Sequence, residues 1–478
     1  MKFCAQNESA KMNRYITAIL IALSATGQAQ SLQSAPKLVV DIAIDQLRTD
    51  YIEAFAPLYG PNGLKKLLSE GRVYEAASYS FEPIDRASAI ASMVTGTSPY
   101  YNGIVSTQWL DRETLRPVTC TDDSRYIDSP ARLYCSTIGD ELKVATNGNA
   151  IIYSIASEKD AAILSAGHAA DGAIWIDSKK GTFTTSAYYS NKAQKWLDAY
   201  KSVYSQRTED EATKNLAIVQ AAKECVSANA MGRDDVTDML SVTLSAKGRN
   251  AKNWQADIEN VYRKLDKVIG DLVQGIEEKV GRQNVLFILT STGCTDEENV
   301  DYSKYRIPTG TFFINRTASL LNIYLGAIYG QGHYVETCFH NEIYLNHKLI
   351  EQKRLSLTEV LSRCQEFLIQ NAGVRDVYTS TRLLAAANNI QKIRLGHNPA
   401  ISGDIIVEIA PGWQLYNEDN QEKYTSRASL VPFPIIIYGA GTKAEHITTS
   451  VSVDRIAPTI AKCIRIRAPN ACKSEPLF

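Results

Sequence analysis

Continuous apolar runs alternate with amphipathic stretches along most of the chain. Runs such as KLVVDIAIDQ lack the every-second-residue polarity of a half-exposed strand, which indicates strands buried on both faces of a sheet. Such strands are predicted at residues 37–46, 150–157, 238–246, 284–292 and 433–441. Helices are predicted at residues 60–71, 137–148, about 253–280 and 454–464. This alternation predicts an α/β fold with a mainly parallel central sheet flanked by helices.

One region interrupts the alternation. Residues 308–402 contain short strand-like pieces such as NEIYLNHKL and the helical pattern LTEVLSRCQEFLIQ. We interpret them as an inserted, smaller α+β lobe, which leaves residues 30–307 and 403–478 as the core domain. The lobe is also the first candidate for a partner surface, although aromatic residues in such a lobe are more often core than interface. Its aromatic side chains are Phe312, Phe313, Tyr324, Tyr329, Tyr334 and Tyr344.

The N-terminal segment has the pattern of an export signal. A basic residue, Arg14, precedes an apolar run over residues 15–25 and a small-residue site that ends at Ala29. We expect a signal peptide over residues 1–29, translated from Met1 or Met12, and a mature protein in the periplasm or cell envelope. No later apolar run approaches the roughly 20 residues of a spanning helix, so we expect no membrane span in the mature chain.

Charge and cysteine content limit the possible binding partners and indicate possible disulfides. The 478 residues carry 51 basic and 52 acidic side chains, so a nucleic-acid-binding role is not expected. Of nine cysteines, only Cys4 lies in the signal segment, and the even remainder suggests disulfides in an exported chain. The candidates by sequence proximity are Cys120–Cys135 and Cys463–Cys472. Buried free thiols are the alternative, above all for Cys225 and Cys364 in helical patterns.

The segment SFEPIDRASAIASMVTGTSPYYNGI predicts a short helix that begins after Asp85 and ends at the TGT stop. The N-terminus of such a helix is where an enzyme would place a nucleophile that faces an anion. This chain has Arg86 there.

Several blocks resemble the exported, phosphate-monoester-cleaving branch of the alkaline phosphatase superfamily, and they occur in that family's order. They include VVDIAIDQLRTDYI, YNGIVSTQWLDRET, SEKDAAILSAGHAADGAIWID and SVDRIAPTIAKCIRI. The resemblance implies a central mixed sheet with metal ligands at the carboxyl ends of its strands. It also implies two zinc ions that activate a Thr or Ser nucleophile.

The residues at the implied site depart from that family's pattern. Asp45 matches the first ligand carboxylate, but Arg86 stands in the nucleophile position and offers no nucleophilic lone pair. On the substrate side, Gln108 stands where the family has Asn, and Lys159 is kept while the Arg two residues later is lost. The remaining ligand positions hold Gly248, Lys252, Thr292, Gly293 and Pro432.

These departures predict a degenerate member with no catalytic residues and no zinc or other cofactor. We interpret it as an inactive scaffold or interaction subunit that binds an unidentified envelope protein. Two alternatives remain: a residual or metal-independent phosphomonoester or phosphodiester hydrolase, and an oxyanion-binding module that uses Arg86 and Lys159. Against the latter, we expect Arg86 to form an ion pair with Asp45, because an unpaired buried carboxylate is costly.

The sequence gives less reason to assign a catalytic or metal-binding role to the other reactive side chains. Ser88 has no neighbouring base, which favours a core serine, and Cys294 is better explained as an inert or disulfide-bonded cysteine. His333, His340 and His347 recur every seven residues, but their segment predicts strands and turns, so a shared metal site is not expected.

Overall fold

The computed structural model describes residues 34–200, 210–248, 254–293, 302–385, 388–425 and 431–478. The predicted signal peptide, Lys252 and Cys294 lie outside these residues. Residues 36–478 form one compact unit. Within the described part of the chain, no helix is long and apolar enough to span a membrane.

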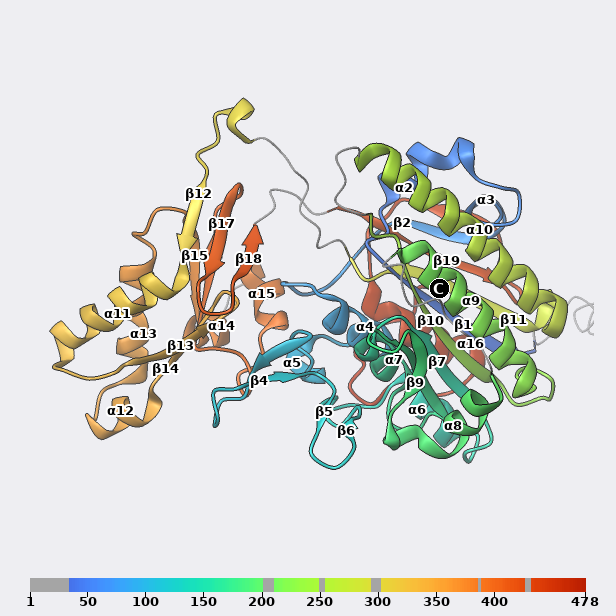
Figure 1. Ribbon diagram of the computed structural model, residues 1–478, viewed down its shortest axis with the longest axis horizontal. Coiled ribbons are helices and arrows are strands. Elements are labelled where there is room, and N and C mark those ends of the chain that lie inside the picture. The colour runs from blue at the N-terminus through green and yellow to red at the C-terminus, as the bar shows by residue number, and fades with distance from the viewer. Residues whose placement is uncertain (1–33, 201–209, 249–253, 294–301, 386–387, 426–430) are drawn as a thin grey trace, which may run out of the picture. The chain divides into compact units, whose positions relative to one another are not determined.

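A mixed sheet of ten strands forms the centre of the fold, as the sequence predicts (Figure 1). Its inner strands run parallel, in the order β11 (Val285–Ser291), β1 (Leu38–Asp45), β10 (Asp238–Ser245), β7 (Ile152–Ala156) and β8 (Gly172–Asp177). The antiparallel strands β19 (Phe433–Gly439) and β9 (Thr182–Thr185) flank this group. Beyond β19 lie β2 (Arg72–Ser78), β20 (Glu445–Ile447) and β21 (Val451–Ser452).

Helices cover both faces of this sheet, and the apolar side chains of each strand divide between two cores. Strand β1 illustrates this division. Val40 and Ile42 pack in the first core, whereas Val39 packs in the second, because successive side chains of a strand point to opposite faces. The first core is covered by α3 (Leu64–Glu70), α7 (Lys159–Ala166), α9 (Glu211–Ala228) and α10 (Trp254–Val280). The second is covered by α6 (Ile138–Ala145) and α16 (Ile456–Ile464).

Helix α4 (Arg86–Thr95) is the short helix that the sequence predicts after Asp85. Asp85 and Ser88 form a reciprocal capping box, in which the Asp85 carboxylate accepts the Ser88 amide at 2.9 Å. Nine of its ten residues are buried, and only Arg86 is partly exposed. The helix ends at Gly96, whose φ of 66° is the left-handed C-terminal cap that favours glycine.

The inserted lobe has its own apolar core and two small sheets. One sheet contains β13 (Val335–Phe339), β14 (Glu342–Leu345), β16 (Ile405–Ile409) and β15 (Val374–Thr379). The other contains β12 (Gly310–Phe313), β17 (Trp413–Asn417) and β18 (Glu422–Thr425). Because β16 to β18 pair within these sheets, the lobe extends past the predicted boundary at residue 402, and the chain rejoins the main sheet at β19. Sequence alone missed this because IIVEI has the same buried-strand pattern as the core strands.

The aromatic residues of the lobe pack mainly inward. Phe312, Tyr334 and Tyr344 are buried, and Tyr324 and Tyr329 are half-buried against the lobe core. The two most exposed apolar side chains on α11 (Ile314–Tyr329) are aliphatic: Leu320 and Ile323 are 53% and 68% exposed. Leu384, Ile369 and Tyr424 are exposed elsewhere in the lobe.

Candidate functional site

The candidate site lies where three parallel strands end together. Asp45 closes β1 and lies in register with Ser245 of β10, and β11 ends one residue before Thr292. The Thr292 hydroxyl donates to the Asp45 carboxylate at 2.6 Å. Asp45, Arg86 and Thr292, which the sequence assigns to three separate positions of one site, are therefore brought together at the carboxyl edge of the sheet.

Arg86 binds two carboxylates. Its Nε and Nη2 atoms each lie 2.9 Å from a different oxygen of Asp160, which is the bidentate geometry of a strong guanidinium–carboxylate pair. Its Nη1 atom lies 3.5 Å from Asp45 Oδ2, so the expected ion pair with Asp45 is present but is the longer of the two. Asp160 is 4% exposed and lies in the first turn of α7.

Burial and pairing act in opposite directions on the charges of this cluster. Burial raises the pKa of Asp45 to about 6, although Arg86 and the Thr292 hydroxyl both act to lower it. Burial also disfavours the charged form of Arg86, but Asp160 and Asp45 outweigh this effect and raise its pKa. The guanidinium is thus a fixed cation held between two carboxylates.

Asp160 was missed as a site residue by sequence reasoning. The resemblance directed attention to Lys159 and to the lost Arg at position 161, and Asp160 lies between them. The available signal was its place in the first turn of the helix KDAAILSA, whose later residues are all small or apolar, because a carboxylate buried there requires a cation.

The remaining predicted positions have other partners. The Lys159 ammonium pairs with Asp128 at 2.7 Å rather than with the Arg86 cluster. Gln108 is exposed at the start of β3 (Gln108–Leu110), where its backbone carbonyl lies 3.2 Å from a ring nitrogen of His340. Pro432 precedes β19, and its carbonyl accepts the Thr49 amide at 3.0 Å. Gly248 lies three residues after β10, and Gly293 has a positive φ of 87°.

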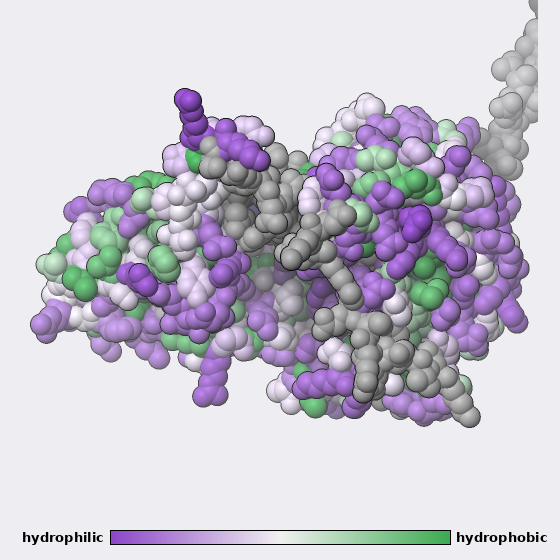
Figure 2. Space-filling model, turned by 45° about the horizontal axis from the view of Figure 1, so that its top comes forward, coloured by the Kyte–Doolittle hydropathy of each residue, from purple (hydrophilic) through white to green (hydrophobic). Residues whose placement is uncertain are grey.

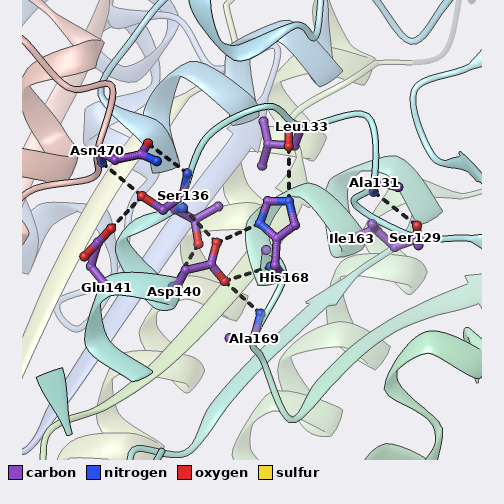
Figure 3. Close-up of polar contacts among 12 residues, drawn as sticks. Ser129, Ala131, Leu133, Ser136, Asp140, Glu141, Ile163, His168, Ala169 and Asn470 are labelled. Atoms are coloured by element: carbon purple, nitrogen blue, oxygen red, sulfur yellow. Dashed lines mark hydrogen bonds and ion pairs between the residues drawn. The ribbon is translucent and has the colours of Figure 1, made fainter. Parts of the chain in front are cut away.

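His168 is held by hydrogen bonds at both ring nitrogens (Figure 3). Its Nδ1 atom lies 2.9 Å from the Asp140 carboxylate, and its Nε2 atom lies 3.1 Å from the carbonyl oxygen of Leu133. Both partners are acceptors only, so both nitrogens donate and the protonated ring is favoured. The Asp140 hydrogen bond is the largest cause of the raised pKa of His168. His168 therefore has a structural role.

Three of the other histidines have separate carboxylate partners. His340 pairs with Glu422, and His347 lies 2.8 Å from Asp404. His446 pairs with Glu75 at 3.0 Å. Each of these imidazoles therefore has its own carboxylate.

The described residues do not fit a pair of zinc ions. A zinc site needs several converging carboxylate, imidazole or thiolate ligands. Among the residues that the structure describes, no group of three or more such side chains is arranged to hold a metal ion. Asp45 and Asp160 do converge, but on the guanidinium of Arg86. The expectation that the chain binds no zinc stays a prediction.

Neither predicted cysteine pair is bonded in the structure, where Cys120, Cys135, Cys463 and Cys472 are free thiols. The amide of Cys120 donates to Thr107, which in turn binds Asp85 at the start of α4. Cys135 interacts with the side chain of Thr95 at the other end of this helix. These contacts place the two cysteines toward opposite ends of α4, whose ten residues span about 15 Å. Cys225 and Cys364 are buried free thiols, in agreement with the alternative for those positions.

Comparison with known proteins gives consistent matches. Residues 39–429 match the type I phosphodiesterase / nucleotide pyrophosphatase family. The chain is 25% identical to the alkaline phosphatase PafA of Elizabethkingia meningoseptica, over 97% of this chain and 98% of that protein. It is 24% identical to the alkaline phosphatase PhoV of Synechococcus elongatus, over 91% of each. The crystal structure of wild-type PafA has a TM-score of 0.81 at 24% identity, over 93% of this chain and 98% of that one, which shows the same fold.

Proposed function

Because the chain belongs to the type I phosphodiesterase / nucleotide pyrophosphatase family, within the alkaline phosphatase superfamily, we propose that it is a member that keeps the fold without the catalysis. In this proposal it is an exported protein of the cell envelope that acts by binding another protein.

One observation carries the proposal: Arg86 is bound to Asp160 and Asp45 where the family's nucleophile and metals would lie. A guanidinium has no lone pair with which to attack phosphorus. Its permanent charge also opposes a dication beside Asp45. The same contact argues against an anion-binding module, since an oxyanion would have to displace the bidentate Asp160 carboxylate, and Lys159 is already paired with Asp128.

The decisive experiment is a combined zinc and turnover assay on the chain that follows Ala29. The protein is incubated with excess zinc, desalted and analysed for bound metal, and hydrolysis of p-nitrophenyl phosphate is followed in parallel. We expect less than one zinc per chain and no turnover above buffer. About two zincs per chain with zinc-dependent turnover would contradict the proposal and favour the hydrolase.

The partner surface proposed here is the exposed face of α11 rather than the buried aromatic residues of the lobe. Most hydrophobic groups on the face drawn in Figure 2 are scattered among hydrophilic ones. Leu320 and Ile323 are neighbours on the helix surface because they are three residues apart.

A Leu320→Ser, Ile323→Ser double variant should lose an envelope protein that the unmodified chain retains after cross-linking in the native host. Val144→Ser, at a 62% exposed apolar position on core helix α6, is the matched control and should retain it.

A further inference from the structure

The C-terminal tail after α16 lies against the core and is fastened by polar contacts at several points. The Leu477 amide donates to the Thr459 hydroxyl at 2.8 Å, and the Tyr74 hydroxyl donates to the Leu477 carbonyl at 3.2 Å. Arg455 donates to the carbonyl of Pro476 at 2.6 Å. The tail therefore has one defined position on the core.

Near the start of this tail, two residues form a reciprocal pair of hydrogen bonds (Figure 3). The Ser136 amide donates to the Asn470 side-chain oxygen at 3.1 Å, and the Asn470 amide donates to the Ser136 hydroxyl at 2.9 Å. Cys135 is the neighbour of Ser136, and Cys472 follows Asn470 by two residues. These bonds bring two cysteine-bearing segments, from distant parts of the sequence, side by side.

Both thiols lie at the same end of helix α4. Cys135 interacts with the Thr95 side chain, and the sulfur of Cys472 lies where a side chain on the next residue, Gly96, would be: a Cβ atom there would stand 2.6 Å from it. Burial raises the pKa of Cys135 to about 12, and the proximity of Cys472 adds to this rise. The two sulfurs thus face one small region of the core.

We propose that Cys135 and Cys472 form a disulfide that fastens the C-terminal tail to the end of helix α4. This pairing replaces the two that sequence proximity suggested, and it rests on the proposed export of the chain, since disulfides persist in oxidising compartments. Such a bond would close a very long loop, the case in which a cross-link restricts the unfolded chain most.

The bond forms by exchange with a disulfide oxidant such as oxidised glutathione. Cys472 is the more exposed thiol; its thiolate attacks one sulfur of the oxidant and releases the other as a thiolate. Cys135 then loses its proton and attacks the Cys472 sulfur, which releases the second thiolate. Two electrons and two protons pass to the oxidant, which leaves as two thiols. When the tail is docked, burial raises the pKa of Cys135 and of Cys472, so exchange is fastest before the tail docks.

The test is a peptide map without reduction. The full mature chain is unfolded, refolded with a mixture of oxidised and reduced glutathione, alkylated and digested. We expect one linked peptide pair that contains Cys135 and Cys472, a mass lower by two hydrogens, and a Tm several degrees above that of the reduced protein. Cys472→Ser should abolish the link and leave Cys135 alkylated, whereas Cys463→Ser should leave it unchanged.

Two results would overturn the proposal: a linked pair that contains Cys120 or Cys463 instead, or complete alkylation of both Cys135 and Cys472 after refolding. Mapping of the protein recovered from its native host separates this question from that of export. A link that forms on refolding but is missing from the cellular protein would contradict export and leave the pairing supported.

Discussion

Arg86 carries one positive charge and faces the carboxylates of Asp160 and Asp45, so the two acids do not contribute equally. Asp160 receives two guanidinium hydrogen bonds at 2.9 Å, while Asp45 lies at 3.5 Å and has its pKa raised to about 6. Near neutral pH, Asp160 is therefore the principal counter-ion, and Asp45 is close to its own titration.

This difference predicts that replacing the two acids by their neutral amides lowers the free energy of unfolding by unequal amounts. Asp160→Asn should lower the free energy of unfolding by about 2–3 kcal/mol at pH 7, somewhat less than the loss for a fully buried pair because the Arg86 side chain is 28% exposed. Asp45→Asn, the matched variant, should cost clearly less. Urea unfolding of both variants beside the unmodified protein measures the difference, and equal costs would show that Arg86 does not prefer Asp160.

Asp41 is a second buried acid, in the middle of β1, and one of its oxygens has no hydrogen-bond partner. Burial raises its pKa from 3.8 to about 7. The folded state therefore holds a proton that the unfolded chain releases, so the stability from this group is complete below about pH 4 and is lost as the pH rises through 7.

Asp41→Asn should remove that dependence on pH. Relative to the unmodified protein, the variant should gain stability between pH 4 and pH 8, by at most about 4 kcal/mol for a pKa shift of roughly three units. Unfolding midpoints in urea at several pH values test this expectation. A constant difference between the two proteins across this range would mean that Asp41 does not titrate there.

At the scale of elements, His168 and Asp140 join α6, the turn after α7 and the loop that contains Leu133. The Asp140 carboxylate also accepts the amides of His168 and Ala169 at 2.8 and 2.7 Å, as Figure 3 shows. Burial opposes its ionisation, but these hydrogen bonds and that of the imidazolium prevail and lower its pKa. The charged His168 ring is what connects this helix start to the loop.

His168→Gln should therefore matter most at low pH. Because the folded pKa of His168 is raised above 6.5, its contribution is complete below about pH 6.5 and is lost as the pH rises through the folded value. The difference in Tm between the unmodified protein and the variant should be larger at pH 6 than at pH 9. His446→Gln reports the effect of removing an exposed imidazole, and a difference that grew with pH would contradict the assigned charge.

The hydrophobic pattern predicted the central strands because a strand buried on both faces is a continuous apolar run in the sequence. Helix α4 could be predicted because Asp85, which caps it, is the residue directly before it. It failed at the end of the lobe, where β16 has the apolar run of a core strand but pairs with β14 and β15. The same limit applies to the site. Asp45 and Arg86 could be identified from their motifs, whereas the choice of Asp160 over Asp45 depends on how α7 meets α4 in space.

At the scale of the whole molecule, the implied catalytic site is assembled from loops that follow β1, β10 and β11, from the start of α4 and from the residue before β19. Only Asp45 at the end of β1 matches the family's pattern, and the other elements contribute residues that depart from it, so restoring one of them leaves the rest unable to bind metal. Arg86→Thr, which would supply the missing hydroxyl, should therefore give no zinc-dependent hydrolysis of p-nitrophenyl phosphate. It should also lower the stability, because Asp160 and Asp45 would then face each other without a cation.

The assay uses zinc-loaded variant and unmodified protein side by side, with a catalytically active member of the family as positive control. Turnover in the variant alone would show that Arg86 is the single barrier to catalysis, and that the metal positions are filled by residues other than those the resemblance assigns.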